Sequence, residues 1–344
     1  MSRLLAQMLR WSGVLLYWLH LHPLVIWLAR RRTRILLYHA CEPTESDFIR
    51  DLESNTPPDR FDAHLNFLVR HYRVVPLDAL ERGAPGDRAV VITFDDGYAS
   101  VYANAFPRLK RLGLSATVYL TTDVVGNRAL IWINELNWLL RNHATVARPL
   151  VESLFDCGQH AAVPAILQRA CARYQPSTVH ALLSEIRARA GLDGGATAAG
   201  ARLYLTWEEV REMGRAGVTF GNHTASHPNL VRLSEAAQAA EIGRAQEAVS
   251  EHVGRPTSLA YPFGLHDAAS RRVAADLRFT SVMEVGGCND VPPTLDRVAR
   301  VPAGDWSCAA LFAELEIVAP AKAYMRRLRD AIRRLVQFTR SPFR

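Results

Sequence analysis

Two short motifs bring together side chains that can bind a metal ion and activate a water molecule. One apolar run ends in Asp95 and Asp96, and a second is followed by His223 and His227. Adjacent residues at a strand end point in different directions, so the two carboxylates can serve two partners, one a metal and the other a water. Pro228 disfavours helix at His227, which places the histidine pair in a turn where both rings can reach one ion. An aspartate with two imidazoles leaves ligand positions open for water, as catalytic metal sites do.

Two further motifs follow the same pattern of an apolar run that ends in a polar or tightly turned segment. In residues 259–264, Pro262 and Gly264 set a turn from which the N–H of Phe263 can point into a site as an oxyanion donor. The run Ile35–Tyr38 ends in His39, a position that a packed core histidine also occupies. Each motif alone is compatible with a plain turn or with core packing. The combination of the four motifs indicates a catalytic site.

The motifs need a scaffold that brings several strand ends together. Short apolar runs alternate with helical patterns along the body of the chain, which indicates an α/β class with parallel strands. The expected strands are 35–38, 89–94, 115–120, 218–221, 258–261, 280–285 and 297–301. The expected helices between them are 58–72, 101–112, 206–216, 234–253 and 267–276, the third of which begins with a capping box of Thr206 and Glu209.

One long stretch departs from this alternation. From about residue 126 to 201 the patterns are helical, with helices expected at 130–141, 163–174 and 178–190 and a Gly/Ala-rich link at 191–200. We interpret this stretch as a helical insertion in the α/β body, where it can cover a site or bind a partner.

Together, the motifs TFDDGY, HTASH, AYPFG and LLYH resemble those of the polysaccharide deacetylase family (NodB-homology, carbohydrate esterase 4), over residues 35–305 apart from the insertion. The resemblance implies a distorted (β/α) barrel of about seven strands with its active site at the strand C-termini. It implies that Asp96, His223 and His227 bind a divalent metal, with Zn²⁺ expected and Co²⁺ or Ni²⁺ as alternatives. It also implies that Asp95 deprotonates the attacking water, and that the backbone at Phe263 stabilises the oxyanion together with the metal.

Two departures from the family pattern concern Asp95 and the proton donor. The third family motif usually begins with an Arg that holds the catalytic aspartate, but this position is Ala260, which leaves the tuning of Asp95 open. No histidine follows His266, so the usual C-terminal Leu-x-His is absent. The segment Leu37–His39 resembles the N-terminal version of that motif in the branch that deacetylates poly-N-acetylglucosamine, so we assign His39 as the acid that protonates the leaving amine. Residues assigned to substrate binding are Tyr98, Tyr261 and Pro262.

Composition and charge exclude several classes of protein. The chain has 344 residues, of which 49% are hydrophobic, so it is neither disordered nor collagen-like nor a small disulfide scaffold. Residues 1–34 and 321–344 together carry a net charge of +13, so the rest of the chain carries −6 although the total is +7. An acidic body lacks the basic track that nucleic acid requires, and we expect no nucleic-acid partner. The five cysteines include no CxxC pair and are interpreted as ordinary thiols.

The two ends of the chain indicate contact with a membrane. Residues 11–29 carry no formal charge, and as one helix they would extend roughly 29 Å, about the thickness of a bilayer core. Pro23 interrupts this segment and arginines flank it on both sides, which favours a re-entrant or interfacial helix as strongly as an uncleaved spanning anchor. A buried globular helix is a third alternative. Residues 321–344 sort into an apolar and an arginine-rich face, as in an interfacial helix on anionic lipid or a terminal helix docked on the core.

We therefore expect a membrane-associated segment 1–34, a deacetylase domain 35–320 and a basic amphipathic helix 321–344. The expected function is metal-dependent N-deacetylation of an amino sugar in a bacterial polysaccharide or a lipid-linked glycan, at the inner membrane, with the arginines favouring its cytoplasmic face. The expected partners are that glycan and membrane lipid. The alternatives are an O-acetyl esterase on the same scaffold and a glycan-binding or assembly component, the latter suggested by Ala260.

Overall fold

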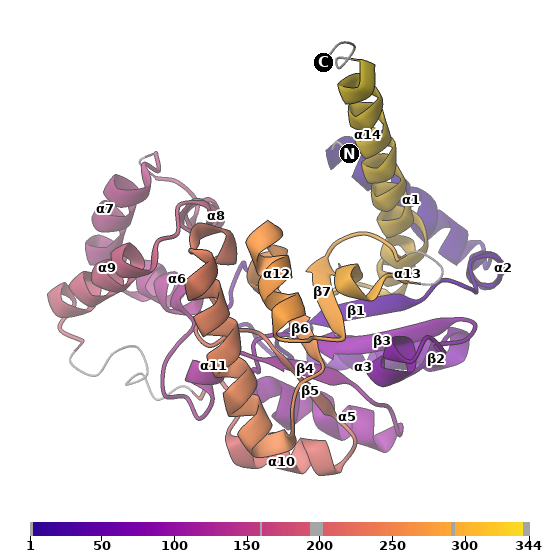
Figure 1. Cartoon of the computed structure of the whole chain (residues 1–344), viewed down its shortest axis with the longest axis horizontal. Coiled ribbons are helices and arrows are strands. Elements are labelled where there is room, and N and C mark those ends of the chain that lie inside the picture. The colour runs from indigo at the N-terminus through magenta and orange to yellow at the C-terminus, as the bar shows by residue number, and fades with distance from the viewer. Residues whose placement is uncertain (1–2, 159, 193–201, 290–292, 340–344) are drawn as a thin grey trace.

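Seven parallel strands close into a barrel, and one short strand flanks it. The computed structural model describes residues 3–158, 160–192, 202–289 and 293–339 (Figure 1). Around the barrel the order is β1, β8, β7, β6, β5, β4, β3, a direct β1–β3 pairing closes the ring, and β2 pairs with β3 at the edge. Because every pairing is parallel, all carboxyl ends lie on one rim. The predicted (β/α) barrel is confirmed.

The strands lie close to the predicted runs. Their bounds are β1 (Arg34–Tyr38), β2 (Arg73–Val74), β3 (Ala89–Phe94), β4 (Thr117–Leu120), β5 (Thr219–Asn222), β6 (Ser258–Ala260), β7 (Ser281–Val285) and β8 (Val298–Pro302). Every residue of β1, β3 and β4 is buried, which explains why these strands read as continuous apolar runs rather than as alternating ones. The two-residue β2 was not predicted, because so short a strand shows no periodicity.

Helices surround the barrel and build the insertion. Around the barrel lie α3 (Pro58–His71), α4 (Leu77–Glu81), α5 (Phe106–Arg111), α10 (Trp207–Arg215), α11 (Glu235–Val253), α12 (Ala268–Asp276), α13 (Cys308–Ala313) and the π-helical η7 (Glu314–Val318). The insertion contains α6 (Trp132–Asn142), α7 (Ala144–Phe155), α8 (Val163–Ala172) and α9 (Pro176–Arg189), which form a lobe beside the barrel (Figure 1). Helix α7 was not predicted, because Pro149 inside it reads as a helix breaker. The capping box at Thr206 is present, and residues 193–201 of the Gly/Ala-rich link lie outside the described residues.

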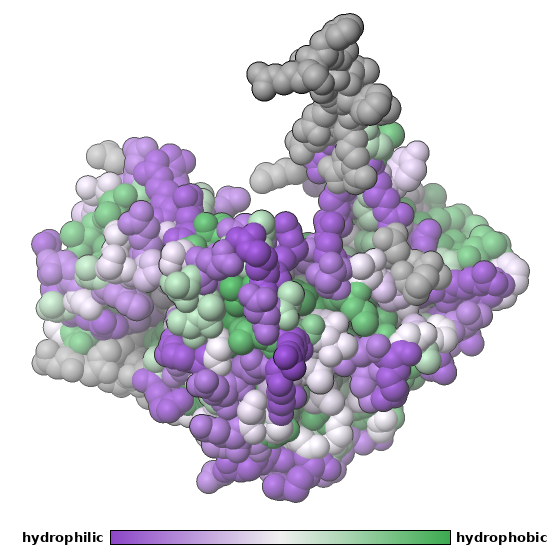
Figure 2. Space-filling model, viewed as in Figure 1, coloured by the Kyte–Doolittle hydropathy of each residue, from purple (hydrophilic) through white to green (hydrophobic). Residues whose placement is uncertain are grey.

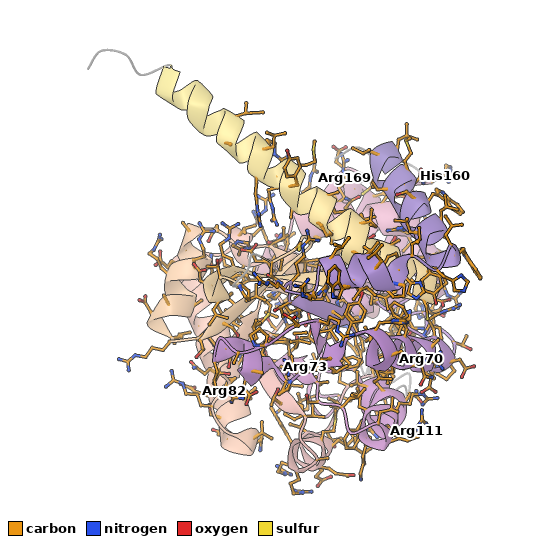
Figure 3. All side chains as sticks on the ribbon, turned by 90° about the vertical axis from the view of Figure 1, so that its right-hand side faces the viewer. Arg70, Arg73, Arg82, Arg111, His160 and Arg169 are labelled. Carbon is orange, nitrogen blue, oxygen red and sulfur yellow. The ribbon has the colours of Figure 1, made fainter. Side chains whose placement is uncertain are left out.

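The apolar segment 11–29 does not form one straight helix. It is divided between α1 (Arg3–Trp18) and α2 (His22–Leu28), and the two axes are bent by 112°. Within the described ranges, no single helix is both long and apolar enough to cross a membrane, and only this bent pair reaches that length and composition jointly. Helix α14 (Ala319–Thr339) continues from η7 and projects from the body (Figures 1 and 3). All five cysteines are free.

Candidate active site

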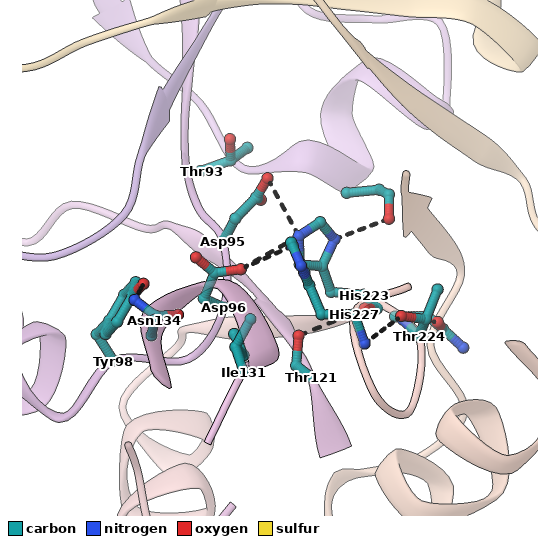
Figure 4. Close-up of polar contacts among 12 residues, drawn as sticks. Thr93, Asp95, Asp96, Tyr98, Thr121, Ile131, Asn134, His223, Thr224 and His227 are labelled. Carbon is teal, nitrogen blue, oxygen red and sulfur yellow. Dashed lines mark hydrogen bonds and ion pairs between the residues drawn. The ribbon is translucent and has the colours of Figure 1, made fainter. Parts of the chain in front are cut away.

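Asp96, His223 and His227 gather their side-chain ligand atoms around one point on the carboxyl rim of the barrel. Oδ1 of Asp96 lies 3.4 Å from Nε2 of His223 and 3.3 Å from Nε2 of His227 (Figure 4). All three residues are buried, and the candidate ligand atoms lie within 4.8 Å of one another. The structure therefore brings together the three residues that the sequence assigned to a metal, and one carboxylate with two imidazoles suits Zn²⁺.

The environment of these three residues fits a divalent cation. Within the described part of the chain, the buried Oδ1 of Asp96 has no hydrogen bond of good geometry, and its nearest polar neighbours are the two imidazole Nε2 atoms. A carboxylate oxygen left in this state is costly unless a cation meets it. Nδ1 of His223 lies 2.8 Å from the carbonyl oxygen of Ala260, which places its proton on Nδ1 and leaves the lone pair of Nε2 for a ligand. Burial lowers the pKa of His227 to about 4, so this ring is held in the neutral, ligating form.

The register of the barrel brings His39 to the same place. In the β1–β3 pair, Tyr38 lies opposite Phe94, so His39 and Asp95 leave neighbouring strands at the same level, and the Asp95 N–H donates to the Tyr38 carbonyl at 3.0 Å. Burial lowers the pKa of His39, while the charges of Asp96 and Asp95 act in the opposite direction. In the described residues the buried Nδ1 of His39 has no hydrogen-bond partner. The predicted proton donor is thus close to both acids.

The loops of the site hold a strained backbone. Four residues other than glycine have left-handed φ angles there: Asp96 at 70°, Thr224 at 66°, His227 at 59° and Phe263 at 57°. Such positions cost about 1–3 kcal/mol each and persist where surrounding contacts fix them. In the histidine loop, Asn222 Oδ1 accepts from the Thr224 N–H at 2.8 Å, and Thr224 Oγ1 accepts from the His227 N–H at 3.1 Å. These contacts aim the His227 ring at Asp96.

Arg300 is a site residue that the sequence analysis missed. Its guanidinium donates from Nη1 to Oδ1 of Asp95 at 2.6 Å and from Nη2 to Oδ2 at 2.7 Å. The side chain is fully buried inside the barrel, where Nη1 also lies 3.3 Å from Thr93 Oγ1 and the guanidinium sits 5.2 Å from the ring of Tyr119. Burial would raise the pKa of Asp95, but the charge and hydrogen bonds of Arg300, together with the smaller effects of His223 and His39, outweigh burial and lower the pKa. The available signal was a charged residue inside the otherwise apolar stretch 298–301.

Phe263 and the insertion close the site around His227. The Phe263 ring meets the His227 ring edge to face, with centroids 4.6 Å apart. Trp132, the first residue of α6, donates from Nε1 to the His227 carbonyl at 3.1 Å, and its ring lies 6.0 Å from that of Phe263. The insertion thus contributes directly to the site. No local pattern in the sequence connects Trp132 with the histidine motif, which lies about ninety residues further along the chain.

The three residues assigned to substrate binding lie beneath the site surface. Tyr98 is 1% exposed, stacks on Tyr204 and accepts a hydrogen bond from Asn134 Nδ2 at 2.9 Å. Tyr261 is equally buried and stacks on His266 with a centroid distance of 4.8 Å. The adjoining Pro262 is also buried. The role that the structure gives these side chains is packing behind the loops, and their contact with a substrate stays a prediction.

A closed parallel barrel with two acids and two histidines on its carboxyl rim defines the class of barrel hydrolases to which the motifs pointed. The chain belongs to the polysaccharide deacetylase family, because the sequence profile described as polysaccharide deacetylase matches residues 82–145 and 143–282, more than half of the chain. Among curated proteins, YxkH of Bacillus subtilis (strain 168), which carries the same family name, is 30% identical over 100 residues. That alignment covers 27% of this chain and 33% of YxkH. The family is one of hydrolases that act on acetyl groups of polysaccharides.

Solved structures share the fold over most of the chain. The Streptococcus pyogenes deacetylase PplD, solved in complex with acetate, superposes with a TM-score of 0.57 at 17% identity and covers 83% of this chain and 98% of its own. IcaB from Ammonifex degensii gives a TM-score of 0.53 at 19% identity, covering 82% of this chain and 97% of its own. The barrel and its surrounding helices are therefore common to these proteins.

Proposed function

We propose that this polysaccharide deacetylase is a metal-dependent N-deacetylase. Its substrate would be an amino sugar with an N-acetyl or other N-acyl group, in a bacterial polysaccharide or a lipid-linked glycan. The observation that carries the proposal is the convergence of Asp96, His223 and His227, whose ligand atoms lie within 4.8 Å of one another. Beside them is the carboxylate of Asp95, which Arg300 binds at both oxygens. Zn²⁺ is the ion that this donor set suits best.

Each step of amide hydrolysis has a candidate group. A divalent ion bound by the three residues would supply Lewis-acid polarisation of water and of the acyl oxygen. Asp95 stays ionised at neutral pH because Arg300 lowers its pKa, so it can accept a proton from the attacking water. Its Oδ2 lies 3.7 Å from Nε2 of His223, next to the ligand cluster. The N–H of Phe263, on the strained turn after β6, can donate to the developing oxyanion.

His39 favours an amide substrate over an ester. An amine leaves only after its nitrogen receives a proton, whereas an alkoxide depends on protonation much less. The position of His39 beside both acids at the end of β1 suits that donation. The alternative of a glycan-binding component without catalysis was suggested by Ala260. Arg300 supplies from β8 the guanidinium that position 260 lacks, which removes the reason for that alternative.

Acetate release from N-acetylated chitooligosaccharides tests the proposal. We expect the purified protein to release acetate, a chelator to abolish the release, and Zn²⁺ or Co²⁺ to restore it. Asp96→Ala and His223→Ala should lose both bound metal, measured by plasma mass spectrometry, and activity. Matched controls are Asp59→Ala and His180→Ala, since both residues are exposed and neither belongs to the rim motifs. Full metal content and full activity in both ligand variants would overturn the assignment.

A further inference from the structure

Helix α1 is fixed to the body of the protein by one face. A Cβ atom at Gly13 would lie 2.5 Å from the Cβ of Ala313, so α1 and α13 are in backbone-close contact. The ring of Tyr17 in α1 packs against the ring of Phe312 in α13, with ring centroids 6.1 Å apart. Arg10 Nη2 lies 2.9 Å from a carboxylate oxygen of the buried Glu314. These contacts orient α1 and determine which of its side chains face outward.

The outward face of α1 is apolar and uncovered. Leu4, Met8, Trp11, Leu15 and Trp18 fall within an arc of roughly 80° at 100° per residue, on the side opposite Gly13. Helix α2 adds Leu24, Trp27 and Leu28, and all eight side chains are between 54% and 73% exposed. We call these eight residues the outer apolar face. Figure 2 shows hydrophobic residues over the part of the molecule where Figure 1 places α1 and α2, and Figure 3 looks onto this side. Large apolar side chains exposed in this number on two consecutive helices mark an interaction site.

The rim of this face is basic. The first acidic residue of the chain is Glu42, whereas Arg30, Arg31 and Arg32 follow α2 directly. These three arginines line an open pocket of about 730 Å³ together with Val25, Leu28, Ala29 and Glu316. Glu316 is already paired with Arg34 at 2.8 Å, and Arg30 lies 3.4 Å from Asp87. In the described part of the chain, Arg31 and Arg32 form no ion pair. The pocket therefore presents uncompensated positive charge beside the apolar side chains.

We infer that the outer apolar face and the Arg30–Arg32 rim form a docking surface for one leaflet of an anionic lipid bilayer. The face carries three tryptophans, the side chain enriched where bilayers meet water, and its adjoining positive charge is complementary to anionic headgroups. The inference concerns location and does not depend on the proposed deacetylation.

Two other arrangements fit the structure less well. A transmembrane helix is disfavoured, because α1 and α2 are bent by 112° and the inner face of α1 holds the Arg10–Glu314 ion pair against the body. A second copy of the chain is disfavoured as the occupant, because the same face on that copy offers no acidic side chain to Arg31 and Arg32: residues 1–41 contain no acid, and Glu316 is paired with Arg34.

Vesicle flotation of the full-length protein tests the apolar part of the surface. We expect the protein to float with vesicles of phosphatidylglycerol and phosphatidylcholine, and binding to fall at least about tenfold in Trp11→Glu/Trp18→Glu. The matched control is Val69→Glu/Leu154→Glu, because these residues are also exposed but lie on α3 and α7. Circular dichroism establishes that both variants remain folded. Equal binding by the Trp11→Glu/Trp18→Glu variant and the wild type would overturn the inference.

The basic rim has its own test. Arg30→Gln/Arg31→Gln/Arg32→Gln should weaken binding to phosphatidylglycerol vesicles by about ten- to a hundredfold and leave the weaker binding to pure phosphatidylcholine unchanged. Arg215→Gln/Arg271→Gln/Arg278→Gln lowers the net charge equally at exposed positions elsewhere and should bind as the wild type does. Equal losses in both triple variants would overturn the assignment of the rim. Sedimentation completes the test: a wild-type dimer that Trp11→Glu/Trp18→Glu dissociates, without vesicle binding, would assign the face to a second copy instead.

Discussion

Arg300 on β8 holds both carboxylate oxygens of Asp95 on β3, at 2.6 and 2.7 Å, from inside the barrel. In the family pattern to which the motifs conform, the corresponding arginine stands at the start of the third motif, where this chain has Ala260. The guanidinium thus reaches the same carboxylate from a different strand. Asp95 can keep one charge state and one orientation because two parallel hydrogen bonds fix both.

Replacing Arg300 should change the pH dependence of catalysis. The acid limb of kcat/KM reports the ionisation of the base in the free enzyme, and Arg300 lowers the pKa of Asp95. In Arg300→Gln that pKa rises, so the base is protonated at a higher pH and we expect the acid limb to move upward by about one pH unit or more. Arg300→Lys keeps the charge but not the two-point contact, and should shift the limb less.

A structural role alone would give a different result for these variants. Loss of a buried partner also destabilises the fold, by about 3–5 kcal/mol for a fully buried pair. Urea unfolding of each variant separates this effect from the pH profile. If kcat falls in Arg300→Gln while the acid limb stays in place, Arg300 does not tune Asp95.

His39→Gln should distinguish amide from ester hydrolysis. Without the proton donor we expect the rate on an N-acetylated sugar to fall by about 10²–10⁴, and the rate on an aryl acetate ester to fall much less, because a phenolate leaves unprotonated. Both rates are measured on the same metal-loaded preparation, with His180→Gln as control because His180 is exposed. Equal losses on the two substrates would assign His39 to a structural role.

Removing the metal should lower the stability of the fold. A ligand that binds only the folded state at a hundred times its Kd adds about 2.7 kcal/mol to the free energy of unfolding. We therefore expect dipicolinate to lower the Tm of the wild type and Zn²⁺ to restore it. Asp96→Ala should show no such shift, whereas Asp59→Ala should behave as the wild type does. A wild-type Tm that does not respond to Zn²⁺ would contradict the metal assignment.

The parts of the site that could be predicted are those whose signal is local. Asp95 and Asp96 follow a buried strand directly, and His223 and His227 are close enough in sequence to share one turn. The role of these four residues can therefore be predicted from the residues next to them. The contacts of Arg300 and Trp132 come from the closure of the barrel and the docking of α6, which join residues far apart in sequence. Pro23 indicated a break in the segment 11–29, but the sequence did not predict the 112° angle between α1 and α2. That angle goes with the packing of α1 against α13, a contact between distant parts of the chain.

Trp132 gives a prediction on the insertion. Its Nε1 hydrogen bond fixes the carbonyl of His227, and its ring fills the space beside Phe263. Trp132→Phe removes the hydrogen bond and keeps most of the packing. We therefore expect metal affinity to fall about 10- to 100-fold, the effect typical of losing a residue that hydrogen-bonds to a metal ligand. Metal titration by competition with a chromophoric chelator measures this change. The control is Trp138→Phe, on the same helix but stacked on Phe48. Unchanged affinity in Trp132→Phe would show that the insertion does not position His227.

His64 should make the protein less stable in mild acid. Its ring lies between the Tyr38 hydroxyl, 3.2 Å from Nδ1, and the Trp306 carbonyl, 2.7 Å from Nε2, an arrangement that suits the neutral ring with its proton on Nε2. Burial lowers the pKa of His64 to about 4, below the unfolded value of about 6.5. Because the unfolded chain binds the proton more tightly, stability from this group is complete above pH 6.5. It falls by about 1.4 kcal/mol per pH unit as the pH drops towards 4.

The contribution of His64 can be isolated by substitution. His64→Gln removes the titrating group but keeps a donor for the Trp306 carbonyl, so we expect its unfolding free energy to be lower at pH 7 and to depend less on pH between 4 and 6.5. Urea unfolding at several pH values in that window measures both slopes. Other buried histidines, His39 and His227 among them, titrate in the wild type and in the variant alike, so the difference between the two slopes belongs to His64. Since His180 is exposed, His180→Gln should keep the full wild-type slope, and a His64→Gln slope equal to that of the wild type would show that His64 does not control the acid response.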